Sequence, residues 1–315
     1  MDLRAIIITH HPPSEFLGNL DNWKRQFDQL LIIDNGSDLQ THTLLQQASQ
    51  KRRGEIEIIL NKTNLGMATA LNQGFSWALK HGSDFIFAFD QDSQPAPGMI
   101  ETILDTFNSH LNREKIAIVA PTVEDLIVGL KGRYLRPRGR FLFERTACAS
   151  QSKLLEDVSI VITSGSLYNL KVYKKIGPFR DDFFIDYVDT EYCLRARQHG
   201  CNIIVNCDAH LYHRLGNQQK KSVGPLTMHP TFHSPERWYY IGRNRIPMFQ
   251  LYVLRFPHWF FYELVIGTYG LVRLLLFEDR KIKKLLALVL GTLDGLTRRM
   301  GPISDSRRAL IAKNS

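Results

Sequence analysis

The sequence predicts an α/β protein whose mostly parallel sheet is flanked by helices. Over the first 120 residues, short apolar runs of strand-like composition alternate with longer segments of helical periodicity. Connections long enough to hold a helix favour parallel strands in a doubly wound sheet. The predicted strands in this part are residues 5–9, 30–33, 56–60, 85–89 and 116–120.

Residue types at the ends of these runs indicate where elements begin and end. Ser14 is suited to cap a first helix that reaches about Phe27. The turn residues at 34–37 end the second strand. Further helices are expected over residues 43–51, from residues 64–68 to Lys80, and after Pro97. In the second half we expect strands at residues 158–162 and 203–205, and a strand-poor insertion at residues 123–157.

Length and charge divide the chain into two parts. At 315 residues it exceeds a typical single domain, so we expect a large α/β domain over residues 1–250 and an amphipathic helical region over residues 251–315. The net charge is +9, and residues 273–315 hold ten Lys and Arg against four Asp and Glu. Most of the surplus positive charge therefore lies in the C-terminal region.

The C-terminal region is apolar between its charges, at residues 256–262, 264–272 and 285–293. Because Glu263, Arg273 and Glu278 interrupt these runs, none reaches the roughly 20 apolar residues of a membrane-spanning helix. This composition predicts helices lying in the interface of an anionic membrane. The alternative is packing on the α/β domain or on a second copy of the chain. Nucleic acid is not an expected partner, because the charge gathers in a Leu-rich segment.

The N-terminus and the cysteines bear on the compartment. The apolar run at residues 5–8 is too short for a secretion signal. The four cysteines form no Cys-x-x-Cys pair. We therefore expect a reducing cytosol and peripheral attachment to the cytoplasmic face of a membrane.

Two carboxylates directly follow the predicted strand at residues 85–89. Asp90-Gln91-Asp92 places both at the carboxyl end of a strand, where open α/β sheets bind ligands. Oxygen ligands of this kind suit Mg²⁺ or Mn²⁺ gripping a nucleoside diphosphate. Taken alone, the pattern is also common in solvated turns.

Other strand ends carry groups suited to a nucleotide. No Walker loop and no Gly-x-Gly-x-x-Gly after the first strand is present. The strand ends instead offer Thr9, Asp34, and Asn64 with Gly66. A carboxylate such as Asp34 can accept the imide N–H of a pyrimidine, although a turn residue is the simpler reading for Asp34 alone. Asn64 beside Gly66 can approach a base or ribose closely.

The second half adds acidic groups and a histidine. Asp182, Asp186, Asp189 and Glu191 fall within ten residues. If a helix begins near Asp186, then Asp186 and Asp189 lie one turn apart at its positive end, where an ionised carboxylate can act as a base. His213 follows the strand at residues 203–205 and is the expected third protein ligand of the metal.

Taken in order, these motifs resemble family-two glycosyltransferases of the GT-A fold, specifically the bacterial rhamnosyltransferases of surface polysaccharides such as O-antigen. The resemblance covers about residues 3–250. It is carried by residues 34–37, Asn64-x-Gly66, Asn72-x-Gly74, residues 90–93, residues 164–166, residues 184–195, His213-x-x-Gly216 and Tyr239-Tyr240-x-x-Arg243-Asn244.

The resemblance implies an inverting, metal-dependent enzyme that uses Mn²⁺ or Mg²⁺. It implies that Asp92 and His213 bind the metal, Asp90 lies at the ribose and metal, and Asp34 reads the pyrimidine. Asp189 is then the catalytic base, with Asp186 as the next candidate. Arg243 and Asn244 are candidates to bind the donor diphosphate, because a guanidinium forks onto phosphate oxygens; a helix-surface arginine is the alternative.

The branch also suggests substrates. dTDP-L-rhamnose is the favoured donor, with a UDP-sugar such as UDP-galactofuranose as the alternative. The expected acceptor is a saccharide linked to undecaprenyl diphosphate at the cytoplasmic face of the bacterial inner membrane. A basic loop at residues 131–140 is either a grip for that diphosphate or a solvated flap. Arg237-Trp238 lacks the upstream Gln of processive synthases, so one sugar per encounter is expected.

Two other classes of protein fit less well. A sugar-nucleotide pyrophosphorylase would have a Gly-rich, Lys-containing loop where this chain has His10-His11-Pro12-Pro13. A non-catalytic nucleotide-sugar-binding scaffold would not need Asp92, Asp189 and His213 together.

Overall fold

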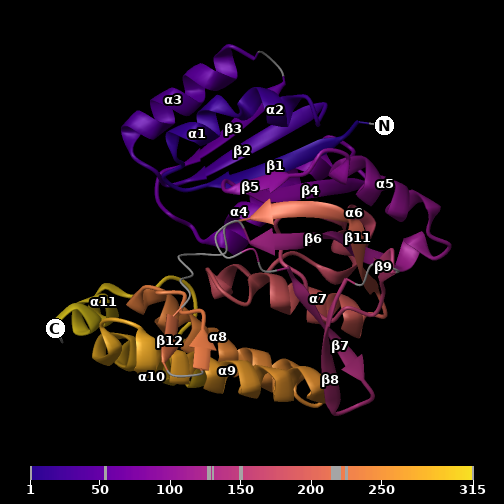
Figure 1. The fold of residues 1–315 in the computed structure, drawn as a ribbon. Coiled ribbons are helices and arrows are strands. Elements are labelled where there is room, and N and C mark those ends of the chain that lie inside the picture. Colours follow the sequence, from indigo (N-terminus) through magenta and orange to yellow (C-terminus); the bar gives the residue numbers. More distant parts are fainter. Residues whose placement is uncertain are drawn as a thin grey trace.

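A mixed sheet forms the centre of the molecule in the computed structural model, and helices cover both of its faces (Figure 1). The structure describes residues 2–52, 55–125, 129, 131–148, 152–213, 221–223 and 226–313. Its largest sheet has the strand order β3-β2-β1-β4-β10-β6-β11-β5, and β9 pairs with β11. This is the predicted α/β class.

The first four strands of the chain are parallel and were predicted correctly. They are β1 (Arg4–Thr9), β2 (Gln29–Asn35), β3 (Ile56–Asn61) and β4 (Phe85–Asp90). Their apolar side chains are buried on both faces, as helices on both sides of a sheet require. The register pairs Thr9 with Asp34 and Ile8 with Asp90, so the polar strand ends meet at one edge.

The helices between these strands lie close to where the sequence places them. They are α1 (Ser14–Gly18), α2 (Leu20–Lys24), α3 (Leu39–Gln50), α4 (Met67–Lys80) and α5 (Met99–Ser109). The single helix predicted from Ser14 to Phe27 is divided at Asn19. The first of its two parts is preceded by Pro13, and no side chain caps it.

The second half of the sheet contains one antiparallel strand that the sequence did not reveal. β10 (Ser166–Asn169) runs antiparallel between β4 and β6 (Ile116–Asp125), and β6 is parallel to β11 (Asn202–His213). The short strands β5 (Ser93–Pro95) and β9 (Leu154–Leu155) also pair with β11. A 3₁₀ turn, η1 (Arg113–Lys115), precedes β6.

Two predictions for the second half are wrong. Residues 158–162 form no strand: Val158 and Val161 are buried by packing against the core without a strand ladder. The insertion at residues 123–157 is not strand-poor, because β7 (Arg133–Arg138) and β8 (Leu142–Ala147) form an antiparallel hairpin. Cys148, just after β8, forms a disulfide with Cys207 of β11, against the expectation of reduced cysteines.

The remaining elements lie beneath the sheet in Figure 1. α6 (Leu170–Ile176), η2 (Asp181–Phe183) and α7 (Val188–Gln198) cover the sheet, and β12 (Lys221–Val223) pairs with β13 (Leu226–Met228). The C-terminal helices are α8 (Pro235–Tyr252), α9 (Pro257–Phe277), α10 (Lys281–Leu296) and α11 (Asp305–Lys313).

α8 and α10 pack closely against each other, and α9 does not share this burial. A Cβ at Gly291 of α10 would overlap the carbonyl oxygen of Tyr239 in α8, so these helices meet backbone to backbone. α9, by contrast, is long and apolar enough to cross a membrane, and 11% of its most apolar window is buried. The prediction that no segment here has this length and composition is therefore wrong. Glu263 is itself buried in an ion pair with Arg245.

Candidate active site

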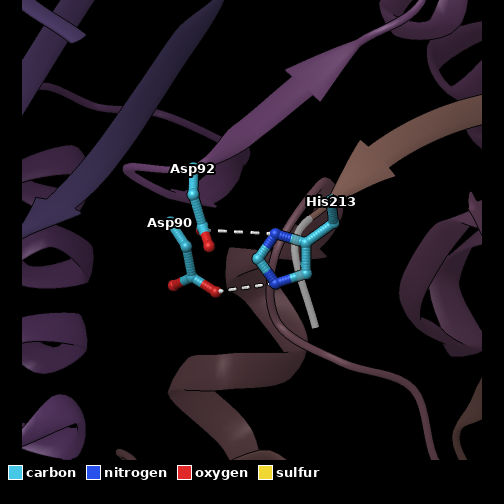
Figure 2. A group of neighbouring side chains, drawn as sticks. All are labelled: Asp90, Asp92 and His213. Carbon is cyan, nitrogen blue, oxygen red and sulfur yellow. Dashed lines mark ion pairs between the residues drawn. The ribbon is translucent and has the colours of Figure 1, made fainter. Parts of the chain in front are cut away.

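Three metal-binding side chains meet at the carboxyl edge of the sheet. The turn after β4 carries Asp90 and Asp92, and the pairing of His213 with Ser93 brings the end of β11 beside that turn. His213 Nε2 lies 3.6 Å from Asp90 Oδ2, and its Nδ1 lies 3.3 Å from Asp92 Oδ1 (Figure 2). Figure 2 shows the imidazole facing both carboxylates. The predicted trio is therefore brought together, although its strands are far apart in sequence.

The trio has a donor set suited to a divalent cation. Its ligand atoms all lie within 4.8 Å of one another, and it is the one such cluster within the described part of the chain. Two carboxylates and an imidazole suit Mn²⁺ well, and Mg²⁺ shares the preference for oxygen. Burial raises the pKa of Asp90 to about 6; His213 opposes this rise, and the Asp92 carboxylate adds to it. Crowded carboxylates are what a bound cation would stabilise.

Two serines hold the trio in place, and the sequence analysis did not assign them this role. Ser164 Oγ accepts a hydrogen bond from the Asp90 backbone N–H at 3.0 Å. Ser93 Oγ lies 3.2 Å from His213 Nδ1 and also contacts Ser164 Oγ. All three groups are buried, so these contacts set the orientation of the imidazole. The Ser164-Gly165-Ser166 motif was the signal for this support.

The two candidate bases, Asp186 and Asp189, have different surroundings. Asp186 accepts from Arg237 at 2.6 and 3.3 Å, so it is engaged in an ion pair. Asp189 Oδ1 accepts from the Thr190 N–H at 2.8 Å, and its other oxygen has no hydrogen-bond partner in the described part of the chain. Burial raises the pKa of Asp189 to about 6, and the Thr190 hydrogen bond opposes the rise. Asp189 is therefore the better placed of the two to accept a proton.

Asp186 and Asp189 do not share a helical face as predicted. α7 begins only at Val188, and Phe184, Asp186 and Tyr187 all have positive φ angles, near +60°. Such a conformation is costly for residues other than glycine and persists only when its surroundings enforce it. The loop before α7 therefore redirects Asp186 toward Arg237 of α8.

Arg243 and Asn244 enforce this loop, which differs from their predicted contact with diphosphate. Both are fully buried in α8. Asn244 Nδ2 donates to the carbonyls of Phe183, Ile185 and Asp186 at 2.8–2.9 Å. Arg243 donates to the carbonyls of Asp182, Phe183 and Gly301. Because these donors are used on backbone oxygens, both residues position the loop that carries Asp186.

Thr9 and Asp34 also differ from their predicted role. Asp34 is fully buried, and its oxygens accept from Thr9 Oγ1, from the Ser37 N–H and Oγ, and contact His42 Nε2 at 2.9 Å. A carboxylate has about four acceptor sites, and these four partners fill them. Asp34 therefore shapes the end of β2 and has no acceptor left for a pyrimidine.

Asn64 and Gly66 lie under a neighbouring loop. Asn64 Oδ1 accepts from Asn35 Nδ2 and from the Gly66 N–H. A Cβ at Gly66, where φ is +87°, would lie 2.6 Å from the Phe184 carbonyl oxygen. That carbonyl accepts from the Met67 N–H at 2.6 Å. Glycine is thus required by the approach of the chain itself, and Asn35, which the sequence suggested only as a turn residue, joins the strand ends.

A large cavity has Asp189 in its lining. Its volume is about 700 Å³, within the range of small-molecule sites. It lies between the β7–β8 hairpin and α9. Its lining includes Ser164, Asp189, Arg133, Arg145, Val265 and Tyr269. A substrate bound there would lie against the better placed of the two candidate bases.

The chain matches the family model described as "Glycosyl transferase family 2" over residues 5–177, more than half of its length. The chain belongs to glycosyl transferase family 2. The trio of Asp90, Asp92 and His213 and the candidate base Asp189 therefore lie in a glycosyltransferase, and the predicted family and enzyme class are confirmed.

Two relatives with known names extend beyond the matched segment. This glycosyltransferase is 26% identical over 311 residues to the dTDP-rhamnosyl transferase RfbF of Shigella flexneri, covering 94% of this chain and 95% of the relative. It is 25% identical over 252 residues to the galactofuranosyltransferase GlfT1 of Mycolicibacterium smegmatis, covering 76% and 80% of the two chains.

Solved structures agree with the fold of this glycosyltransferase. S. aureus TarS 1–349 in complex with UDP-GlcNAc has a TM-score of 0.55 at 15% identity, over 98% of this chain and 84% of that chain. GalNAc-T7 with UDP, GalNAc and Mn²⁺ has a TM-score of 0.54 at 11% identity, over 68% and 44%. The GT-A fold expected from the sequence is therefore confirmed.

Proposed function

We propose that this glycosyltransferase transfers L-rhamnose from dTDP-L-rhamnose to a hydroxyl of a lipid-linked saccharide during bacterial surface polysaccharide synthesis. The observation that carries the proposal is the joint placement of the Asp90–Asp92–His213 trio and Asp189, since Ser164 contacts the trio and lines the cavity with Asp189. The likeness to a dTDP-rhamnosyl transferase over nearly the whole chain supports the donor.

Asp189 is proposed as the general base. Its carboxylate would remove the proton of an acceptor hydroxyl while that oxygen attacks the anomeric carbon from the face opposite the leaving group. A single displacement of this kind inverts the anomeric configuration. Asp186, held by Arg237, is proposed to shape the site electrostatically, and Arg237 brings positive charge toward Asp189 and Asp90.

Asp92, His213 and Asp90 would hold Mn²⁺ or Mg²⁺, whose charge offsets the charge that develops on the departing nucleoside diphosphate. The first supporting observation is that the three ligand groups converge from two strands and are oriented by buried serines. The nucleotide is proposed to lie along the strand ends formed by Thr9, Asp34, Asn64 and Gly66, with these residues shaping its bed.

One other donor has a specific observation in its favour. The second relative is a galactofuranosyltransferase, so a UDP-sugar such as UDP-galactofuranose is the alternative. A non-catalytic nucleotide-sugar-binding scaffold would also keep the fold. It would have no use for a carboxylate like that of Asp189, which is half-buried beside a cavity and has a raised pKa.

The proposed location is peripheral, at the cytoplasmic face of the bacterial inner membrane, where an undecaprenyl diphosphate-linked acceptor would be found. α9 supports this, because it exposes Phe261, Leu264, Val272, Leu275 and Leu276. Such a face can bury itself in an anionic membrane interface. A homo-oligomer formed through the C-terminal helices is the alternative use of the same face.

The test of the donor is transfer of labelled sugar. The purified protein with Mn²⁺ is given dTDP-L-rhamnose or UDP-galactofuranose together with membranes that contain polysaccharide precursors. We expect incorporation from dTDP-L-rhamnose and none from UDP-galactofuranose. The reverse result would move the proposal to the second donor, and no incorporation from either would contradict the proposal of transfer to a lipid-linked saccharide.

A further inference from the structure

The cavity that contains Asp189 has two chemically different walls. One wall is the β7–β8 hairpin, which contributes Arg133 and Arg145, with Lys131 beside it. The other is α9, which contributes Val265, Ile266 and Tyr269. A cavity with one cationic wall and one apolar wall is complementary to a molecule with an anionic group attached to an apolar chain.

The cationic wall carries two available guanidinium groups. Arg133 and Arg145 are exposed, and neither has a carboxylate partner within the part of the chain that the structure describes. The hairpin register pairs Arg133 with Ala147 and Leu135 with Arg145, so the two arginines are diagonal neighbours. Diagonal neighbours in an antiparallel pair are about 7–8 Å apart, within reach of long side chains, so both can fork onto one phosphate or diphosphate.

The other cations of this segment are placed differently. Arg136, a member of the predicted basic loop, donates to the Glu156 carbonyl oxygen at 3.0 Å and pairs with Glu144 at 3.4 Å. Lys131 pairs with Glu124 at 3.6 Å. Arg138 and Arg140 are exposed but are not among the residues that line the cavity. The grip predicted for residues 131–140 therefore falls on Arg133 and on Arg145, which lies outside that loop.

The apolar wall continues out of the cavity onto the surface. Val265 lines the cavity and is still 56% exposed, so it joins the exposed face of α9. The hairpin turn exposes Phe141 and Leu142, and the Phe141 ring lies 6.5 Å from the Phe261 ring of α9. Figure 1 shows the hairpin reaching down beside one end of α9. An apolar chain leaving the cavity would therefore stay in contact with apolar side chains.

We propose that Arg133 and Arg145 bind the phosphate of an amphiphilic acceptor whose apolar chain lies along α9 and the hairpin turn. This assignment rests on the proposed function, since it places the acceptor of that reaction. With the phosphate on the hairpin, the sugar attached to it extends toward Asp189. The β7–β8 hairpin thereby selects acceptors that carry both phosphate and lipid.

The test measures binding of geranylgeranyl diphosphate in detergent micelles, with dTDP and Mn²⁺ at saturation to keep the donor site filled. Geranylgeraniol, which lacks the phosphates, and inorganic pyrophosphate, which lacks the chain, are measured in parallel. The variant is Arg133→Glu with Arg145→Glu. The matched control is Arg138→Glu with Arg140→Glu, which changes the net charge equally on the same hairpin. Thermal unfolding of both variants verifies that they fold.

We expect wild type and control to bind geranylgeranyl diphosphate alike, and the Arg133/Arg145 variant to bind it at least about tenfold more weakly, because each arginine makes charge-assisted hydrogen bonds. Geranylgeraniol and pyrophosphate should each bind more weakly than geranylgeranyl diphosphate. Equal binding by the two variants would overturn the proposal. Pyrophosphate binding as tightly as the lipid would reduce the site to a simple anion site and would also overturn it.

The same experiment separates this proposal from the proposed function. dTDP binding in the presence of Mn²⁺ is measured first on the wild-type protein. If dTDP binds and the lipid arms fail, only the acceptor site is wrong. If dTDP does not bind, the proposed dTDP-sugar donor is wrong, whatever the lipid does.

Discussion

At the scale of single residues, the main result is that two neighbouring carboxylates have separate tasks. Asp186 is held by Arg237, and Asp189 keeps one oxygen without a partner in the described part of the chain. The sequence identified both as candidate bases but not which one is engaged, because the pairing depends on the positive-φ loop before α7. Arg243 and Asn244 were likewise recognised as important, whereas the backbone carbonyls they hold are visible only in three dimensions.

Replacing the proposed base is the first prediction. Asp189→Asn is expected to lower turnover by about 10²- to 10⁴-fold, the usual contribution of general-base assistance, and to leave dTDP binding intact. Turnover is measured with saturating donor and acceptor, and dTDP binding by thermal stabilisation. Unchanged turnover in this variant would exclude Asp189, and Asp186→Asn would then be tested in its place.

The pH dependence of the reaction follows from the same carboxylate. Because burial raises the pKa of Asp189 to about 6, the base is protonated below that pH, and kcat/KM should fall as the pH drops through about 6. The folded-state pKa is above the value of 3.8 for a free Asp, so the stability contribution of this group is present below about pH 4 and is lost as the pH rises through 6. The residual activity of Asp189→Asn should lack this acidic limb; a limb that persists would belong to another group, such as Asp90.

At the scale of elements, the sequence was a good guide where one signal decided the structure. The first four strands are continuous apolar runs, and their polar ends lie at one edge of the sheet as predicted. Burial alone misled at residues 158–162, where apolar side chains are buried without a ladder, and β10 was missed because its four residues are too few to show a pattern. The β7–β8 hairpin was missed because Arg-rich strands lack the apolar alternation of a half-buried strand.

The close contact between α8 and α10 gives a prediction on stability. Gly291→Ala should lower the free energy of unfolding by about 1–3 kcal/mol, because the added methyl group meets the Tyr239 carbonyl and the helices must separate. Gly270→Ala in α9 is the control: its Cβ would make an ordinary 3.6 Å contact with Trp238, so the change should be neutral or stabilising. Denaturant unfolding measures both, and equal effects would contradict backbone-to-backbone packing.

The exposed face of α9 gives a prediction on membrane binding. Leu264→Glu with Leu275→Glu should weaken binding to anionic vesicles at least about tenfold, since each buried Leu contributes about 1.5–3 kcal/mol. Leu39→Glu, an exposed position on α3, should bind vesicles as wild type does. Vesicle sedimentation measures this. Undiminished sedimentation of the α9 variant would show that this face serves another purpose, such as self-association, which size-exclusion chromatography would detect.

At the scale of the whole molecule, the site lies between two parts with different chemistry. The sheet supplies the trio and the strand ends, and the C-terminal helices supply the residues that hold the loop before α7. α8 crosses residue 250, so the proposed boundary between residues 1–250 and 251–315 divides a helix. The chain thus depends on its C-terminal helices for the geometry near Asp189, which the two-part prediction did not anticipate.

The most direct test of the central claim, a metal-dependent nucleotide-sugar site at the Asp90–Asp92–His213 trio, is thermal stability with Mn²⁺ and dTDP, UDP or GDP. We predict stabilisation by dTDP only when Mn²⁺ is present, of about 2.7 kcal/mol when the nucleotide is near 100 times its Kd. Asp92→Ala should abolish it. A larger response to UDP would favour the galactofuranosyl alternative. No response to any nucleotide, or the same response in Asp92→Ala, would contradict the account.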